Sequence, residues 1–157
     1  MSHQYNRVSR GAQLTQVAIF KQIWINSNKK SMVSNLFLRE FVNTDLFFNC
    51  FAHVLAKGQN KYPYFKYYAK NIVLLTPGEH ALLDQGTEEA RISYALDVKS
   101  ADWGPLKALE EELKKEYKKV FPTTQGGIIG YKYSPLEQTA KVGKLNERFF
   151  KALKKGR

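Results

Sequence analysis

The sequence contains one cysteine, few acidic residues for its basic content, and no long apolar run. A single cysteine excludes an internal disulfide framework and any zinc site built from several thiolates. No apolar segment approaches the ~18–20 residues that span a bilayer, and residues 1–10 lack the apolar core of a signal peptide. We therefore expect a protein of the cytoplasm, with no membrane partner.

The charge balance is strongly basic. The 157 residues include 25 lysines and arginines against 14 acidic residues, which gives a formal charge of +11. Hydrophobic residues make up 43% and aromatic residues 13%, enough to build the core of one folded domain. The positive charge favours a polyanionic partner such as DNA, and the alternative is a basic surface that only keeps the protein soluble.

The charge is unevenly distributed along the chain. Residues 51–76 contain four lysines and no acidic residue, whereas residues 77–104 contain six acidic and two basic residues. Tyrosines alternate with these lysines. The lysines would neutralise phosphates, and the tyrosines would pack either on sugars and bases or against the core. We predict DNA-contacting side chains at Lys57, Lys61, Tyr62, Tyr64, Lys66 and Lys70.

Hydrophobic periodicity predicts an α+β protein with a strand–strand–helix order in its middle. The second strand is followed by Thr76, Pro77 and Glu79, the signature of a capped helix start. The C-terminal basic segment is compatible with either a helix or a partly ordered tail. The expected elements are helices at 13–24, 77–85 and 106–121 and strands at 46–55 and 72–75, with 136–153 left open between the two alternatives.

Four polar residues within this order suggest chemistry. His80 and Asp84 are four residues apart, so they share one face of the predicted helix and could bind one Mg²⁺, Mn²⁺, Zn²⁺ or Ni²⁺ ion. His53 ends the first strand, where its imidazole could remove a proton from a water molecule. Asn71 begins the second strand. The alternative is a purely structural role, in which the histidines and the asparagine only stabilise the core.

The order His53, Asn71, His80 resembles the HNH endonuclease motif, also called the ββα-metal or His-Me finger. The surrounding segments FAHVLAKG, YP, NIVLL and GEHALLD are similar to those of small HNH proteins, many of them from phages. The resemblance covers roughly residues 46–92. It implies two short antiparallel strands and a helix, flanked by N- and C-terminal helices. The expected organisation is a flexible lead at 1–12, a single HNH domain at 13–121 and a basic extension at 122–157.

The resemblance also implies a role for each residue. His53 matches the general base that activates water for attack on a DNA phosphodiester. Asn71 matches the residue that orients the loop and the base, or in some members binds the metal. His80 matches a ligand of one divalent metal ion, with Asp84 as a further candidate. The expected activity is metal-dependent cutting or nicking of DNA, with duplex DNA as the partner.

One position departs from the family pattern. Many members have an acidic residue or a histidine directly before the general base, as a metal ligand, and this chain has Ala52 there. The metal would then depend on His80 with Asp84, on Asn71, or on a more distant acid such as Asp45. The alternative function is therefore a non-catalytic nucleic-acid-binding or accessory protein on the same fold, with a degenerate metal site.

Overall fold

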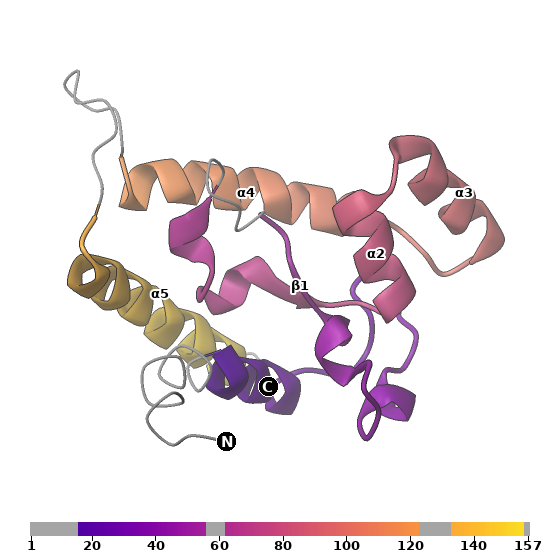
Figure 1. Ribbon diagram of the computed structural model, residues 1–157, viewed down its shortest axis with the longest axis horizontal. Coiled ribbons are helices and arrows are strands. Elements are labelled where there is room, and N and C mark those ends of the chain that lie inside the picture. Colours follow the sequence, from indigo (N-terminus) through magenta and orange to yellow (C-terminus); the bar gives the residue numbers. More distant parts are fainter. Residues whose placement is uncertain (1–15, 56–61, 123–132, 156–157) are drawn as a thin grey trace, which may run out of the picture.

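The computed structural model describes residues 16–55, 62–122 and 133–155, and this part of the chain is mostly helical with one two-stranded antiparallel sheet (Figure 1). The predicted α+β class is confirmed. The expected lead at residues 1–12 lies outside the described residues. Residues 16–25 are helical. The later elements are β1 (Phe51–His53), β2 (Ile72–Leu74), α2 (Pro77–Gln85), α3 (Glu88–Asp97), α4 (Gly104–Val120) and α5 (Pro135–Lys155).

The sheet is short, and backbone hydrogen bonds continue beyond both of its ends. Val54 N donates to Asn71 O over 2.8 Å, and Leu75 N donates to Cys50 O over 2.9 Å. These bonds align the residues on either side of the strands as well as the strands themselves. The loop that follows β1 is therefore held against the residue that precedes β2.

The predicted strand over residues 46–55 is wrong in its extent, because only Phe51–His53 is a strand. Residues Phe47–Cys50 form a 3-10 helix instead. This turn packs the Phe47 ring edge-on against Trp24, with ring centroids 5.0 Å apart. An apolar run can be buried in either conformation, so its hydrophobicity alone does not distinguish a strand from a compact turn.

The two faces of the sheet pack against different parts of the chain. Side chains alternate along a strand, so Phe51 and Ile72 belong to a cluster with the helix at residues 16–25, while Ala52 and Val73 belong to a cluster with α4 and α5. Phe20 stacks on Phe51 with ring centroids 4.3 Å apart. The sheet is therefore the shared layer between two hydrophobic clusters.

The helix α2 begins and ends where the sequence predicts. Thr76 Oγ1 accepts a hydrogen bond from Glu79 N (3.1 Å), and Thr76 N donates to Glu79 Oε1 (2.9 Å), which confirms the predicted capping box. Gly86 follows the last residue of the helix. The reciprocal bonds satisfy two backbone donors and make this start of the helix well defined.

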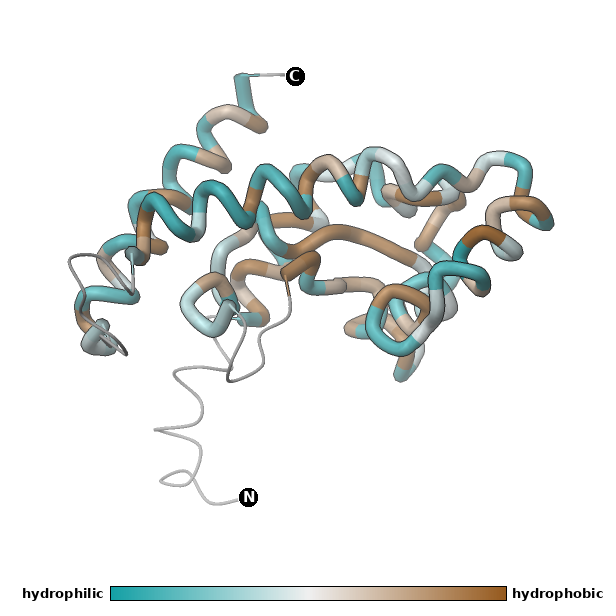
Figure 2. Tube along the Cα trace, turned by 90° about the horizontal axis from the view of Figure 1, so that it is seen from above, coloured by the Kyte–Doolittle hydropathy of each residue, from teal (hydrophilic) through white to brown (hydrophobic). Residues whose placement is uncertain are grey.

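The long helices α4 and α5 are amphipathic, as the alternating colours along both show (Figure 2). Their buried residues include Leu113 and Tyr117 on α4 and Val142 and Leu145 on α5. The predicted helix at 106–121 is confirmed, and the C-terminal basic segment is a helix rather than a partly ordered tail. Within the described ranges, no helix is both long enough and apolar enough to cross a membrane.

Candidate active site

His53 is the last residue of β1, and its ring is bonded to the loop between the strands. The ring Nε2 lies 2.8 Å from the backbone oxygen of Lys66. A carbonyl only accepts hydrogen bonds, so Nε2 carries the proton and the lone pair of the neutral ring is on Nδ1. The bond fixes the tautomer and the orientation of the imidazole. These are the properties that a general base requires.

Asn71 is fully buried, and its side chain bonds to the backbone of the same loop. Oδ1 accepts from Leu55 N (2.7 Å), while Nδ2 donates to Leu55 O (3.3 Å) and to Phe65 O (3.1 Å). The amide therefore connects the residues just after β1 with the segment that bonds to His53. The two roles that the family resemblance implies for Asn71, orienting the loop and binding a metal, both stay predictions.

His80 and Asp84 lie side by side on α2, as their spacing predicts. His80 Nε2 is 3.0 Å from Asp84 Oδ2, and His80 Nδ1 is 2.7 Å from the backbone oxygen of Asn49. The side chain of His80 is 23% exposed and that of Asp84 is 53% exposed, so solvent reaches the pair. A ring that donates from Nδ1 to the Asn49 carbonyl has its lone pair on Nε2, next to the carboxylate.

The distance between these two atoms suits shared binding of a cation. Neighbouring ligands of an octahedral ion with bonds of about 2.1 Å are about 3 Å apart. Imidazole and carboxylate are both common ligands of divalent ions. The same distance also suits a protonated His80 that forms an ion pair with Asp84.

The structure does not gather all the predicted site residues at one point. His53 is paired with Ile72 at the loop end of β1, whereas His80 bonds to Asn49, which precedes the other end of β1. Within residues 16–55, 62–122 and 133–155, no group of three or more His, Cys, Asp or Glu is placed to hold a metal ion. A cation here would therefore have two protein ligands, with water or phosphate oxygens completing its shell, as is usual for Mg²⁺.

The position before His53 brings no additional ligand. Ala52 is fully buried and belongs to the cluster formed with α4 and α5. Asp45, the more distant acid considered above, is exposed and precedes the Phe47–Cys50 turn. The absence of a metal ligand at position 52 therefore fits the structure, because this face of the strand lies in the hydrophobic core.

A buried carboxylate beside His80 was not predicted from the sequence beyond its capping role. Glu79 is fully buried and accepts hydrogen bonds from the hydroxyls of Ser31 and Tyr94, the latter over 2.5 Å. Burial and the bond to Glu79 raise the pKa of Tyr94 to about 12. The network connects α2 to α3 and to the turn at Ser31. It fixes the helix that presents His80, and its partners are too distant in sequence for a local motif to reveal them.

The predicted DNA-contacting residues have varied surroundings. Lys57 and Lys61 lie outside the described residues. Tyr62 packs edge-on against Tyr117 with ring centroids 5.1 Å apart, and Tyr64 stacks on the same ring at 6.1 Å. Both tyrosines thus hold the loop against α4, in line with the core-packing alternative. Their contacts with DNA stay a prediction.

The two described lysines of this loop differ in their partners. Lys70 Nζ is 3.3 Å from Glu112 Oε1 and 3.9 Å from Glu116 Oε1, so acids of α4 offset its charge. Lys66 Nζ lies 5.3 Å from the centre of the Tyr67 ring. Lys66 therefore remains the better candidate for a phosphate contact among the described residues of this loop.

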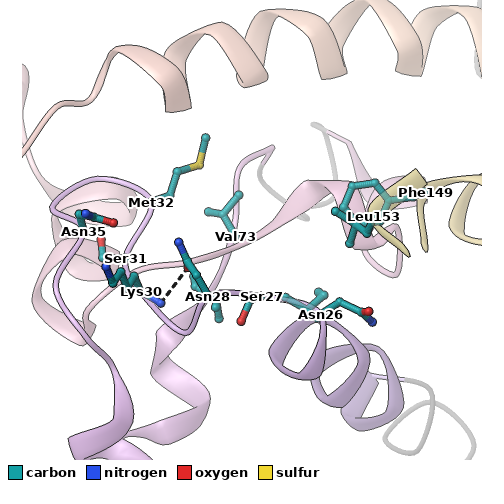
Figure 3. Close-up of a pocket in the computed structure, with 12 residues that line it drawn as sticks. Asn26, Ser27, Asn28, Lys30, Ser31, Met32, Asn35, Val73, Phe149 and Leu153 are labelled. Carbon is teal, nitrogen blue, oxygen red and sulfur yellow. Dashed lines mark hydrogen bonds between the residues drawn. The ribbon is translucent and has the colours of Figure 1, made fainter. Parts of the chain in front are cut away.

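A pocket of about 390 Å³ lies apart from these residues. Figure 3 shows its lining side chains, which come from the segment 26–35, from β2 and from α5. Its one titratable lining residue is Lys30, and Asn28 Oδ1 accepts a hydrogen bond from Lys30 N over 3.1 Å. Neither histidine of the candidate site lines it. The pocket is therefore lined by no histidine or carboxylate, and we assign it no role in catalysis.

Comparison of the chain with family models, with curated proteins and with solved structures finds no match. A functional assignment therefore depends on the order of the motif residues and on their geometry.

Proposed function

We propose that the protein is a divalent-metal-dependent endonuclease with an HNH-type ββα-metal unit, which hydrolyses phosphodiester bonds in DNA. One observation supports this most: β1 ends in His53, Asn71 directly precedes β2, and α2 presents His80 with Asp84. Each residue type thus occurs on the kind of element where its proposed role requires it.

His53 acts as the general base. Its Nδ1 removes a proton from the attacking water, and the resulting imidazolium keeps its Nε2–H bond to the Lys66 carbonyl. That carbonyl favours the positive ring because its dipole points a partial negative charge at Nε2. Asn71 is a positioning residue, since its amide holds the backbone on both sides of the loop that orients the ring.

His80 and Asp84 would hold the metal ion through Nε2 and a carboxylate oxygen. When bound, a divalent cation supplies positive charge that stabilises the negative charge developing on the phosphate and on the leaving oxygen. The Asn49 carbonyl orients the His80 ring by accepting from Nδ1. The buried Glu79 network holds α2, and with it both ligands, against the rest of the domain.

A second candidate is a nucleic-acid-binding protein on this fold that does not cut. The apolar, fully buried Ala52 favours it, because the family often has a metal ligand at this position. The two candidates differ in whether the protein binds a divalent ion and in whether His53 affects any reaction.

A cleavage assay with supercoiled plasmid tests the leading proposal. We expect nicked or linear DNA with Mg²⁺, Mn²⁺, Zn²⁺ or Ni²⁺. In EDTA, the plasmid should stay supercoiled. His53→Gln keeps an amide donor near Nε2 for the Lys66 carbonyl but has no basic nitrogen, so cleavage should fall by about 10²–10⁴-fold while the melting temperature is unchanged. No cleavage by the wild-type protein with any of the four ions, or equal cleavage by His53→Gln, would overturn it.

Calorimetric titration with Mn²⁺ tests the metal ligands separately. Asp84→Asn should weaken ion binding at least about tenfold, because a neutral amide replaces a carboxylate ligand. The matched control is Asp97→Asn, which changes an exposed acid on α3 and should bind as the wild type does. If the wild-type protein binds no ion but still binds DNA, the non-catalytic candidate replaces the nuclease.

A further inference from the structure

One face of α5 is a continuous row of cations. Basic residues recur along it at spacings of three and four, which places them on the same side of an α-helix. All of them are exposed. The row is roughly 21 Å long, at about 1.5 Å per residue. We call this surface the basic stripe; its members are Lys141, Lys144, Arg148, Lys151 and Lys155.

The opposite face of α5 is fixed to the domain. Val142 and Leu145 are buried in the cluster with α4, and both side-chain amide atoms of Asn146 bond to the loop between the strands. The stripe therefore lies on the solvent-exposed side of α5. In Figure 2 the C-terminal part of α5 stands clear of the other elements, so a large ligand can approach it.

The charges of the stripe are not offset by acids. The ion pairs found in the described part of the chain involve His80, Arg91 and the lysines at 70, 107 and 114, and no member of the stripe. Lys141 instead lies over the rings of Phe121 and Tyr133. Five like charges on one face repel each other, and a polyanion would relieve that repulsion.

We propose that the basic stripe binds the phosphate backbone of duplex DNA, and so supplies non-specific affinity for the substrate; this rests on the proposed function. Phosphates of one strand are spaced about 3.4 Å apart along the duplex axis, so a row of this length runs past about six of them. On α5, Val142 and Leu145 are buried, and Phe149 and Phe150 pack partly buried against the hydrophobic clusters. Most of the apolar face is thus engaged by the protein, which argues for DNA rather than insertion into an anionic membrane.

Binding of a labelled 20-base-pair duplex, measured by fluorescence anisotropy in EDTA over a series of KCl concentrations, tests this role. The triple variant Lys144→Gln, Lys151→Gln, Lys155→Gln should bind more weakly, and the slope of log K against log[KCl] should become shallower by about 2 to 3. The matched control removes the same charge from α4 with Lys115→Gln, Lys118→Gln and Lys119→Gln, three exposed residues. Its slope should stay within about one unit of the wild-type slope.

Several results would overturn the proposal. These are an unchanged slope in the stripe variant, equal losses in both triple variants, no duplex binding by the wild-type protein at low salt, or binding to phosphatidylserine vesicles in preference to the duplex. Far-ultraviolet circular dichroism must show that the stripe variant keeps the helix content of the wild type. If the helix content falls, the single variant Lys151→Gln replaces the triple variant, and its expected slope change is about 1.

The outcome is separable from that of the nuclease proposal. The binding assay contains no divalent ion and does not depend on cleavage. His53→Gln should bind the duplex with the wild-type slope, because phosphate contacts and not His53 determine the affinity. A protein that binds through the stripe but never cuts would refute the nuclease proposal alone, whereas cleavage with no effect of the stripe variant on binding would refute the stripe alone.

Discussion

His53 and Asn146 donate hydrogen bonds to neighbouring carbonyl groups of one backbone segment, although they belong to β1 and α5. His53 Nε2 bonds to Lys66 O (2.8 Å), and Asn146 Nδ2 bonds to Tyr67 O (2.9 Å). Asn146 Oδ1 also accepts from Ala69 N over 2.7 Å. The segment that orients the proposed base is therefore the one that holds α5.

Replacing Asn146 should loosen both the backbone segment at Lys66 and Tyr67 and the attachment of α5. Asn146→Ala removes two hydrogen bonds and leaves a partly buried N–H and carbonyl unpaired, so the free energy of unfolding should fall by about 1–3 kcal/mol. Amide hydrogen exchange in α5 should become faster. Glu147→Ala, an exposed neighbour on the same helix, is the control and should cost less than about 0.5 kcal/mol. Equal stability of the two variants in urea denaturation would contradict the role of Asn146.

The buried amide of Asn71 should matter more for stability than any exposed asparagine. Asn71→Ala leaves the N–H and carbonyl of Leu55 and the carbonyl of Phe65 without their side-chain partner, and we expect a loss of about 2–4 kcal/mol in the free energy of unfolding. Asn43→Ala, at an exposed turn, should change it by less than about 0.5 kcal/mol. Chemical denaturation measures both, and an Asn71→Ala protein as stable as Asn43→Ala would refute this interpretation.

The bond between Tyr94 and Glu79 should make stability depend on alkaline pH. The pKa of Tyr94 is raised to about 12, by burial and by Glu79, from about 10 in the unfolded chain. A raised pKa in the folded state stabilises the protein fully below pH about 10, and this contribution is lost as pH rises through about 12. Urea denaturation between pH 9 and 12 should show that loss.

The variant Tyr94→Phe isolates this contribution. At neutral pH it should be less stable by about 1–3 kcal/mol, because Glu79 loses a buried donor. Its stability should also fall less steeply above pH 10 than that of the wild type. Tyr62→Phe, in the aromatic cluster on α4, is the control, because it leaves the bonds to Glu79 intact. Parallel curves for wild type and Tyr94→Phe would show that the bond to Glu79 contributes nothing.

The only cysteine should be unreactive in the folded protein. Cys50 is fully buried, and burial, followed by the charge of Glu79, raises its pKa to about 11. Thiolate is the reactive form, so labelling with a disulfide reagent at pH 8 should be slower than that of glutathione by at least about 100-fold. In urea the two rates should become similar. Fast labelling without denaturant would show that the strand region opens.

Local features of the site were predictable, and its long-range contacts were not. Thr76, Glu79, His80 and Asp84 belong to one short helix and its N-cap, where spacing along the chain determines which side chains meet. The bond from His53 to the Lys66 carbonyl joins residues 13 apart, and the bond from Ser31 to Glu79 joins residues 48 apart. No helix or strand period relates such positions, so the motif suggests that His53 is important without indicating what orients it.

The amino-acid sequence by itself determined the capped helix α2, the pair of strands around a basic loop and the amphipathic helix α4, because each follows largely from contacts between near neighbours. Only the tertiary structure decided that residues before β1 turn instead of extending, that Glu79 is buried with Tyr94, and that α5 docks through Asn146 with its cations outward. These depend on which distant surfaces meet, since burial and hydrogen bonding of polar groups are satisfied only once the whole core has assembled.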